Sequence, residues 1–415
     1  MLEVIILLLG ISALFSYINH RVFRLPITIG LFIQALVLCF GLLALQNLMP
    51  QPYEFFFQIV ERIDFEFLLM DVMLSFLLFA GAMHVDIRRL QRQRLPVLVF
   101  ATFGVAVNTV LVGSAVYGLA SLIELNVPYL HCLLFGALIA PTDPIAVLSI
   151  LKSSGVSGSL EMKIEGESLF NDGLGVVVFL TLLSLTGQQD QQSVLLEAGH
   201  LFLSESVGGI LYGLALGLLG KSMLYSSSDA PKICVMITLA IASVGYAVAS
   251  LLHVSGPLAM VVAGLYIGHS ICSDAFSDHS RRILDIFWEM LDDTLNAILF
   301  VMIGLVAHNL NFRTDYLLVG MATIIVVLGA RAISVGILYS LIKQDDLHTP
   351  STIFLLTWGG LRGGISVALA LSLTGIESRQ FILFITFTVV AFSIIVQGLT
   401  IGPLAARLKK EDGSQ

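Results

Sequence analysis

The stretch Ala140-Pro141-Thr142-Asp143-Pro144 places an acidic residue between two prolines, inside the apolar run 129–151. Each proline removes a backbone donor and clashes with the preceding helical turn, so a helix over this run must open near Asp143. Open backbone and a charged side chain are both costly away from water. The stretch therefore predicts an interrupted helix whose break surrounds Asp143.

Apolar side chains dominate the whole chain. Of 415 residues, 57% are hydrophobic and 12% are charged, whereas a soluble domain has roughly 25% charged residues. So few charges cannot cover a water-facing surface of this size, and the net charge of -8 argues against a nucleic-acid partner. A membrane-spanning helix needs about 20 apolar residues. We therefore expect an all-α polytopic membrane protein with about thirteen spans: 2–19, 25–47, 66–86, 96–121, 129–151, 161–186, 199–220, 231–251, 255–270, 287–308, 315–342, 349–373 and 380–405.

The distribution of Lys and Arg gives the orientation, because basic residues collect in cytoplasmic loops. Of the 21 basic residues, 16 follow the odd-numbered spans, three (Arg62, Arg313 and Arg379) lie on the other side, and Arg331 and Arg362 lie inside spans. A missed or invented span would scramble this sorting. We expect the N-terminus outside, the C-terminus in the cytoplasm, and the plasma membrane as the location.

A second interrupted segment is Trp358-Gly359-Gly360-Leu361-Arg362-Gly363-Gly364, in which four glycines surround one arginine. Glycine is less favourable in a helix than alanine by about 1 kcal/mol, so this run also favours an open backbone. The fifth and twelfth spans, which hold the two breaks, are seven apart and cross the membrane in opposite directions. Paired interrupted helices in two inverted halves indicate the binding site of a secondary transporter.

Five charged side chains fall well inside the spans: Asp143, Glu167, Asp172, Arg331 and Arg362. A charge at mid-bilayer costs at least about 2.5–3.5 kcal/mol, so each is a functional candidate. From the cytoplasmic ends, Asp143 lies roughly 12 Å deep, Asp172 and Arg331 roughly 16 Å, Arg362 roughly 18–20 Å and Glu167 roughly 9 Å. Four helices thus bring charges together near the middle of a core about 30 Å thick.

The sixth span contains Glu165-Gly166-Glu167-Ser168-Leu169-Phe170-Asn171-Asp172-Gly173. Ser168 and Asp172 are four residues apart and share one helix face, while Glu167 and Asn171 share the neighbouring one. A hard monovalent cation binds oxygen. The carboxylates of Asp172 and Asp143, the Ser168 hydroxyl and a freed carbonyl near Thr142 are candidate ligands, with water completing the shell. A carboxylate that holds either a proton or a cation, but not both, is the minimum machinery of an exchanger.

Five strings carry a resemblance: Glu-Ser-Leu-Phe-Asn-Asp at 167–172, Thr-Asp-Pro at 142–144, Trp-Gly-Gly-Leu-Arg-Gly at 358–363, Ser-Gly-Pro-Leu-Ala at 255–259 and Phe-Trp-Glu at 287–289. Together they resemble the cation/proton antiporter family, in particular its NhaP branch, which also includes the animal sodium/proton exchangers. The resemblance runs from about the third span to the twelfth. One departure is Ala80, in the string Phe-Leu-Leu-Phe-Ala-Gly-Ala, where members of the family often have an acid.

The resemblance implies an NhaA-like fold of two inverted repeats with crossed discontinuous helices. It further implies a homodimer and an elevator-like movement of a core domain against a dimerisation domain. We expect one transmembrane unit over 1–405, with a core of about 66–186 and 287–405, and a short cytoplasmic tail at 406–415. The dimerisation and core domains would be interleaved along the chain.

The resemblance also assigns roles. Asp172 would carry the proton and the cation, with Asn171 as its neutral neighbour, so that one cation exchanges for one proton without net charge movement. Thr142 and Asp143 would belong to the crossed helices, and Ser168 would be a cation ligand. Glu167 would pair with a buried arginine, and two residues qualify: Arg331 is the first choice and Arg362 the alternative.

We therefore expect an antiporter for Na+ or Li+ against H+, which acts in pH homeostasis with lipid as its surroundings. No resident cofactor is expected, because Na+ and H+ are transported substrates. A K+/H+ antiporter is the first alternative. The second is a proton-coupled organic-anion transporter, because a half-helix N-terminus near Arg362 can hold a carboxylate. An enzyme is disfavoured, because the sequence has no metalloprotease, Ser/His/Asp or nucleotide-loop string. Asp292 and Asn296, four residues apart, either face the site or satisfy each other.

Overall fold

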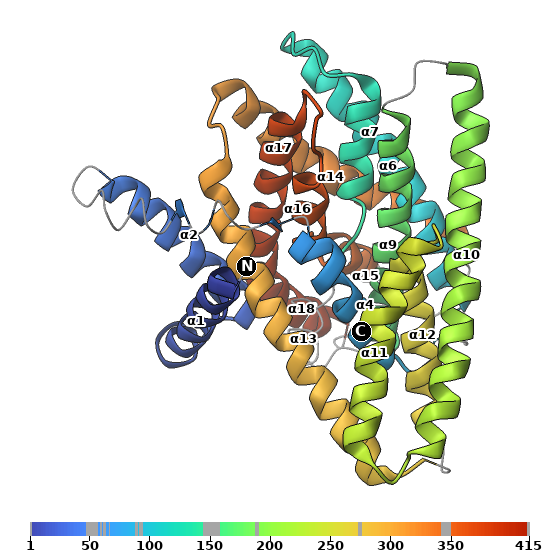
Figure 1. The fold of residues 1–415 in the computed structure, drawn as a ribbon. Helices are drawn as coiled ribbons and strands as arrows, with labels where there is room; N and C mark the ends of the chain where they lie inside the picture. The colour runs from blue at the N-terminus through green and yellow to red at the C-terminus, as the bar shows by residue number, and fades with distance from the viewer. Residues whose placement is uncertain are drawn as a thin grey trace.

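The computed structural model describes residues 2–46, 57–58, 60, 64–65, 67–87, 90, 94–143, 158–186, 191–272, 276–341 and 350–412. These residues form helices and short connections, with no strand among them, so the all-α expectation is confirmed (Figure 1). In the same ranges, ten helices are long and apolar enough to cross a membrane, and two more apolar helices are shorter. The chain is thus a multi-pass membrane protein, while the number of thirteen spans stays a prediction.

The helices follow one another along two halves of the chain. The first half contains α1 (Leu2–Ile18), the π-helical turn η1 (Asn19–Phe23), α2 (Ile27–Leu45), the π-helical turn η2 (Phe67–Met73), α4 (Leu74–His84), α6 (Arg94–Leu122), α7 (Tyr129–Leu138), α9 (Gly158–Leu185) and α10 (Gln191–Ser226). The second half contains α11 (Pro231–Leu251), α12 (Gly256–Ile271), α13 (Asp278–Val306), the 3₁₀ turn η3 (Ala307–Asn309), α14 (Thr314–Leu341), α15 (Pro350–Trp358), α16 (Gly364–Leu371), α17 (Arg379–Phe392), the π-helical turn η5 (Ser393–Gln397) and α18 (Gly398–Asp412).

Two helices extend well beyond the spans predicted from hydropathy. The predicted span 287–308 is the apolar part of α13, which begins at Asp278. The predicted span 199–220 likewise lies inside α10, which covers Gln191–Ser226. The physical reason is that a polar helical turn is stable outside the lipid, for example where Arg281 and Asp285 face each other at i and i+4 (3.9 Å). Hydropathy detects only the part of a helix that is apolar enough to enter the membrane.

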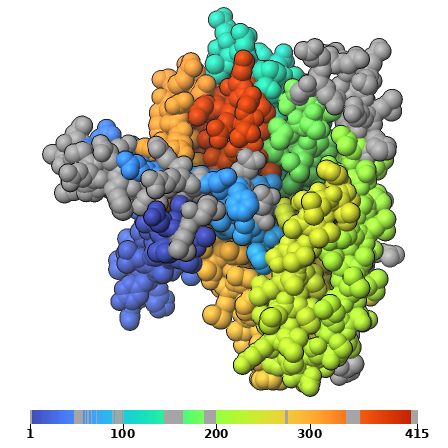
Figure 2. Space-filling model, viewed as in Figure 1, coloured from blue at the N-terminus to red at the C-terminus, as the bar shows by residue number. Residues whose placement is uncertain are grey.

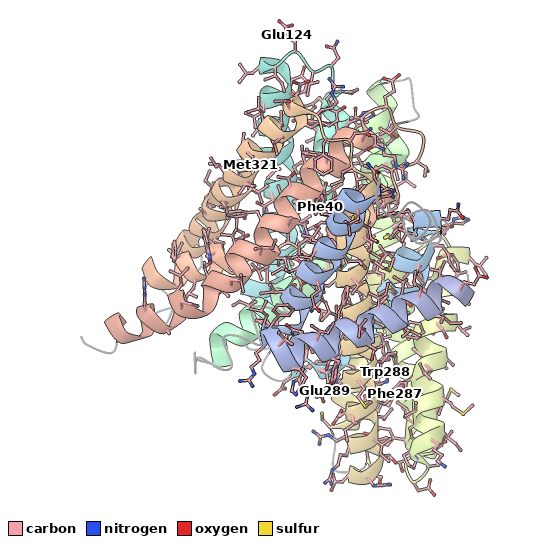
Figure 3. All side chains as sticks on the ribbon, turned by 90° about the vertical axis from the view of Figure 1, so that its left-hand side faces the viewer. Phe40, Glu124, Phe287, Trp288, Glu289 and Met321 are labelled. Carbon is pink, nitrogen blue, oxygen red and sulfur yellow. The ribbon has the colours of Figure 1, made fainter. Side chains whose placement is uncertain are left out.

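The helices pack in two groups (Figure 1). One group contains α6, α7, α9, α14, α16 and α17, which contact one another. The other contains α10, α11 and α12, with α4 packed against α12. Helix α13 contacts α2, α4, α11 and α16, and therefore lies between the groups. Figure 2 shows α1 and α2 projecting from one side of the molecule, and Figure 3 shows α1 crossing α13 near Phe287, Trp288 and Glu289.

Helices α4 and α12 are held together by close backbone approach. A Cβ atom on Gly264 would lie 2.7 Å from the carbonyl oxygen of Phe79, and one on Gly268 would clash with the carbonyl oxygen of Met83. Two glycines four residues apart form a smooth strip on one helix face, which is how membrane helices pack closely without a hydrophobic driving force. The backbones of α4 and α12 are therefore in direct contact.

The outer helices leave large apolar side chains exposed, which is the expected surface of a protein in lipid. Leu122, Leu251 and Ile325 are 80%, 78% and 75% exposed. By contrast, Trp288 on α13 is fully buried and donates from Nε1 to Thr238 Oγ1 at 3.0 Å. Its ring also packs against Phe79, with ring centroids 4.8 Å apart. This contact ties α13 to both α11 and α4.

Candidate ion-binding site

Both interrupted segments open where the sequence predicts it. Helix α7 ends at Leu138, and the chain is non-helical over 141–143. Helix α15 ends at Trp358, and α16 begins only at Gly364. The backbone N–H of Asp143 donates to the carbonyl oxygen of Leu361 at 2.7 Å, so the two open segments meet. We call the place where the segments 141–143 and 359–363 meet, beside α9, the junction. The part of the fifth predicted span that follows Asp143 lies outside the described residues.

Helix α9 holds the first open segment through Thr142. The Asn171 amide donates from Nδ2 to Thr142 Oγ1 at 2.9 Å, and its Oδ1 accepts from the Thr142 backbone N–H at 3.3 Å. The Ser168 hydroxyl donates to the Thr142 carbonyl. All three side chains are buried. The hydrogen bonds fix the open segment against the helix face that carries Asp172.

Two carboxylates lie at this junction. Asp172 Oδ1 is buried, and no group in the described part of the chain forms a hydrogen bond with it. Asp143 and Arg362 are the charged groups close enough to interact electrostatically with Asp172. The side chain of Asp143 packs against Gly363, where an added Cβ would lie 2.6 Å from both Cβ and Oδ2 of Asp143. The second open segment therefore touches the acid of the first.

Arg362 satisfies the backbone that the break leaves open. Its Nη1 donates to the carbonyl oxygens of Ala140 (2.6 Å) and Pro141 (3.0 Å). Both carbonyls lie in the open segment that follows α7, which ends at Leu138. The guanidinium of Arg362 thus supplies a donor to this open backbone from across the junction, while its own backbone N–H donates to Ser393 Oγ at 2.8 Å.

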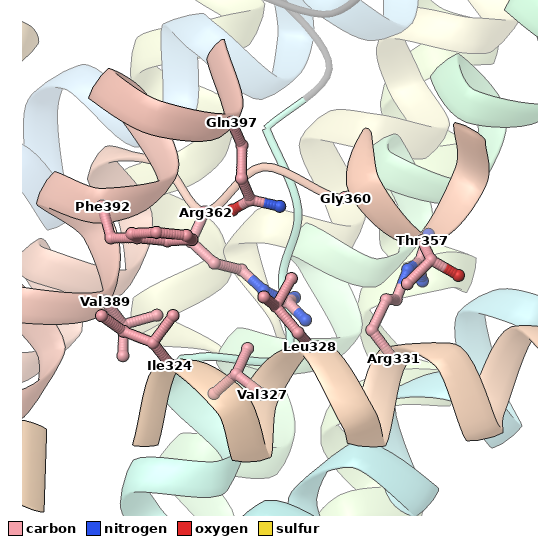
Figure 4. A pocket seen from close by; sticks show the side chains of 10 residues that line it. All are labelled: Ile324, Val327, Leu328, Arg331, Thr357, Gly360, Arg362, Val389, Phe392 and Gln397. Carbon is pink, nitrogen blue, oxygen red and sulfur yellow. The ribbon is translucent and has the colours of Figure 1, made fainter. Parts of the chain in front are cut away.

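Arg331 forms a separate buried pair. Its Nη1 contacts Glu167 Oε1, and both side chains are 6% exposed. The structure therefore places Glu167 beside the first of the two arginines that the sequence allowed. In Figure 4, Arg331 rises from α14 beside Thr357, and Arg362 reaches over α14 from the segment after Gly360. The cavity between them has a volume of only about 10 Å³, roughly one water site.

The structure brings together all eight residues singled out from the sequence. Thr142 and Asp143 come from the first open segment, and Ser168, Asn171 and Asp172 come from α9. Glu167 and Arg331 form an ion pair, and Arg362 contacts the first open segment at Ala140.

Two residues of the junction were not foreseen from the sequence. Ser393 accepts the N–H of Arg362, and Gln397 Nε2 donates to the carbonyl of Trp358 at 2.8 Å, which caps the end of α15. They lie four residues apart in the π-helical turn η5, inside the otherwise apolar run 380–405. Buried polar residues at helical spacing in an apolar run were the available signal.

Asp292 and Asn296 lie on the α13 face that leads to the junction. Leu299, one turn further along, packs directly against Gly364 at the start of α16. Asn296 Nδ2 donates to the backbone carbonyl of Asp292 at 2.9 Å, and Asp292 lies close enough to Asp143 to interact electrostatically. The two residues thus contact each other, as one alternative has it, and Asp292 also lies near the site, as the other has it.

Comparison with known proteins decides the family. The model of the transmembrane sodium/hydrogen exchanger family matches residues 10–407. The chain belongs to the sodium/hydrogen exchanger family. Members of this family are transporters, so the assignment to a transporter rather than an enzyme is confirmed, as is the resemblance to the NhaP branch.

Sodium/hydrogen exchanger relatives match almost the whole chain. The Na+/H+ antiporter NhaP of Pseudomonas aeruginosa is 43% identical over 98% of this chain and 97% of its own length. The Na+/H+ antiporter NhaH of Halobacillus aidingensis is 34% identical and covers 97% of both chains. The solved structure of the sodium proton antiporter MjNhaP1 from Methanocaldococcus jannaschii has a TM-score of 0.73 at 21% identity, over 97% of each chain. This last likeness shows a shared fold.

Glu167→Gln should strongly destabilise the protein, because it leaves Arg331 charged and unpaired in the interior. Removing one partner of a buried pair costs about 3–5 kcal/mol. The melting temperature in detergent measures the effect. Asp315→Asn is the control, since Asp315 pairs with Arg313 at 3.0 Å on the surface, with side chains 49% and 56% exposed. An equal shift in both variants would contradict a stabilising role for the buried pair.

Gly363→Ala should displace Asp143 and lower transport sharply, because the new Cβ would occupy the space of the Asp143 side chain. Overpacking of this kind costs about 1–3 kcal/mol. Gly329→Ala on α14 is the control, since nothing lies within 4 Å of the added Cβ. Cation-driven proton movement in proteoliposomes is the measurement. Normal transport by Gly363→Ala would show that the Asp143 position is not required.

Proposed function

We propose that this chain exchanges Na+ for H+ across the membrane and that Asp172 carries both ions. The observation that carries this proposal is the buried Oδ1 of Asp172, which has no hydrogen-bond partner in the described part of the chain, beside the second acid Asp143. A buried carboxylate oxygen without a partner is costly, and a proton or a cation removes the cost. The names of the NhaP and NhaH relatives support the choice of Na+ and H+.

The oxygens around Asp172 suit a hard monovalent cation. The Ser168 hydroxyl uses its hydrogen on the Thr142 carbonyl, which leaves the lone pairs of its oxygen free for a cation. Thr142 Oγ1 accepts from Asn171, so this hydroxyl is oriented as well. We propose Asp172, Asp143, Ser168 and Thr142 as Na+ ligands, with Asn171 orienting Thr142. A Li+ ion would use the same oxygens.

The charges of the junction favour a one-for-one exchange. Glu167 and Arg331 neutralise each other. When all are ionised, Arg362 is left with Asp143 and Asp172, so these three groups lack one positive charge. Asn171 beside Asp172 adds no further acid. One Na+ or one proton supplies the missing charge, and exchange of one for the other moves no net charge.

We propose alternating access by an elevator-like movement. The group α6, α7, α9, α14, α16 and α17 surrounds the junction and would move against α10, α11 and α12. The expected core of 66–186 and 287–405 includes α4 and α13. The close packing of α4 on α12 favours a moving body that begins after α4. A homodimer in the plasma membrane, with the N-terminus outside and a role in pH homeostasis, completes the proposal.

The alternatives differ in how well they fit the junction. K+ binds the same kinds of oxygen, so a comparison of cations decides between Na+ and K+. An organic anion would need open space beside a cationic group, but the cavity beside Arg362 and Arg331 has a volume of only about 10 Å³. The junction therefore favours a cation.

Asp172→Asn should abolish exchange and leave the protein folded, because the amide keeps the shape of the side chain but has no negative charge and cannot take up and release a proton. Transport in proteoliposomes and the melting temperature are measured together. Asp315→Asn, on the surface, should transport normally. Retained exchange by Asp172→Asn would exclude Asp172 as the carrier.

Addition of Na+ should dissipate a preformed pH gradient in proteoliposomes at the same rate with and without a potassium/valinomycin clamp. Li+ and K+ are tested in turn under the same conditions. A rate that depends on the clamp would exclude electroneutral exchange, and proton movement with K+ alone would replace Na+ by K+. If no cation moved protons, the antiporter proposal would fail.

A further inference from the structure

The turn between α1 and α2 is held in an unusual backbone conformation. Helix α1 widens into η1, and Arg24 follows with φ = 52°, in the left-handed region. The Arg24 N–H donates to the Asn19 carbonyl at 2.6 Å. The buried Asn19 side chain donates to the Leu25 carbonyl at 2.8 Å and accepts from the Leu25 N–H at 3.3 Å. Left-handed conformations of residues other than glycine are uncommon and costly, and Asn19 fixes this one.

This turn surrounds a hollow of about 570 Å³ whose lining is basic. Its residues are Asn19, His20, Arg21, Arg24, Leu25 and Ile27. Both guanidinium side chains are exposed, and neither forms an ion pair with a carboxylate in the described part of the chain. Arg21 lies over the ring of Tyr17, 5.9 Å from its centroid. Two permanent positive charges thus line one hollow that has space for a ligand of substantial size.

The residues beside the hollow are apolar and exposed. Tyr17, Val22, Phe23 and Ile27 are between 50% and 67% exposed. In a membrane protein, a basic hollow next to such side chains lies where lipid headgroups meet acyl chains. Figure 2 shows α1 and α2 at the edge of the molecule. A free inorganic anion would make no favourable contacts with these apolar side chains.

We propose that the hollow binds the phosphate of an anionic phospholipid. The planar guanidinium groups of Arg21 and Arg24 match a phosphate with paired hydrogen bonds. The acyl chains would run along Tyr17, Val22 and Phe23. The sorting of basic residues places this turn on the cytoplasmic side, whose leaflet is the anionic one. None of these residues belongs to the ion junction, so the proposal is independent of the transport proposal.

The rival explanation is a diffuse attraction of basic residues to an anionic membrane, each contributing about 1 kcal/mol. Arg282 and Arg281 provide the comparison. They lie in another loop that is predicted to be cytoplasmic, at the start of α13, and Arg281 already faces Asp285 at 3.9 Å. Diffuse attraction would affect both arginine pairs equally. A specific binding site at the hollow would make lipid binding depend on Arg21 and Arg24 more than on Arg281 and Arg282.

The test is the melting temperature of the full chain in detergent, titrated with phosphatidylglycerol, phosphatidylcholine or inorganic phosphate. We expect phosphatidylglycerol to stabilise the wild type more than phosphatidylcholine does. Arg21→Gln/Arg24→Gln should need roughly 30-fold more phosphatidylglycerol for the same shift, while Arg281→Gln/Arg282→Gln should respond as the wild type. Native mass spectrometry should show a retained phosphatidylglycerol in the wild type and the control, but not in Arg21→Gln/Arg24→Gln.

Three results would overturn the proposal. The first is an equal phosphatidylglycerol response in both double variants, which would indicate diffuse attraction. The second is stabilisation by inorganic phosphate to the same extent as by lipid. The third concerns Arg21→Lys/Arg24→Lys, which keeps both charges and avoids a failure to fold. A wild-type response of this variant would exclude guanidinium-specific recognition.

Discussion

An open backbone inside a membrane needs partners for every N–H and C=O group, and this requirement shapes the centre of the molecule. Each unsatisfied group costs several kcal/mol where no water is present. Here the two open segments supply partners to each other. The Asp143 N–H donates to Leu361, and Arg362 donates back to Ala140 and Pro141. The arginine is thus buried because the broken helix requires a donor that no neighbouring turn can supply.

The same arrangement explains why acids are tolerated in the interior. Arg362 is fixed on the carbonyl oxygens of Ala140 and Pro141. Its positive charge also lies close enough to Asp172 to interact with it electrostatically. Glu167 neutralises Arg331, so the positive charge of Arg331 is engaged by this pair. In the proposed exchange, an ion pair to Asp172 would compete with the cation and the proton for its carboxylate. Among Arg362, Asp143 and Asp172 the negative charges exceed the positive ones by one, which is the basis of the proposed one-for-one exchange.

The sequence reveals the fold and the junction to different degrees. The breaks near Asp143 and Arg362 could be predicted, because proline and glycine act on the local backbone. The charges could be placed at a common depth, because depth follows from residue count along a helix.

The choice between Arg331 and Arg362 for Glu167 could be ranked but left open, because depth says little about which sides of two helices face each other. Ser393 and Gln397 were missed, because each caps backbone more than thirty residues away. The extents of α10 and α13 were underestimated, because polar turns outside lipid carry no hydropathy signal.

In the proposed elevator-like movement, the ion junction would move along helix α13. Trp288 and Thr238 fasten α13 to α11, and α1 and α2 also contact α13, so in the proposed movement α13 would stay with α11. At its other end, Leu299 packs on Gly364, the first residue of α16. A larger residue at 364 would interlock with Leu299, whereas glycine presents only backbone to it. Asp292, two turns earlier on α13, lies close enough to Asp143 to interact with it, so the acids of the junction would pass along a polar edge of the fixed part. The contact between Leu299 and Gly364 is therefore the surface at which the moving and fixed parts would slide.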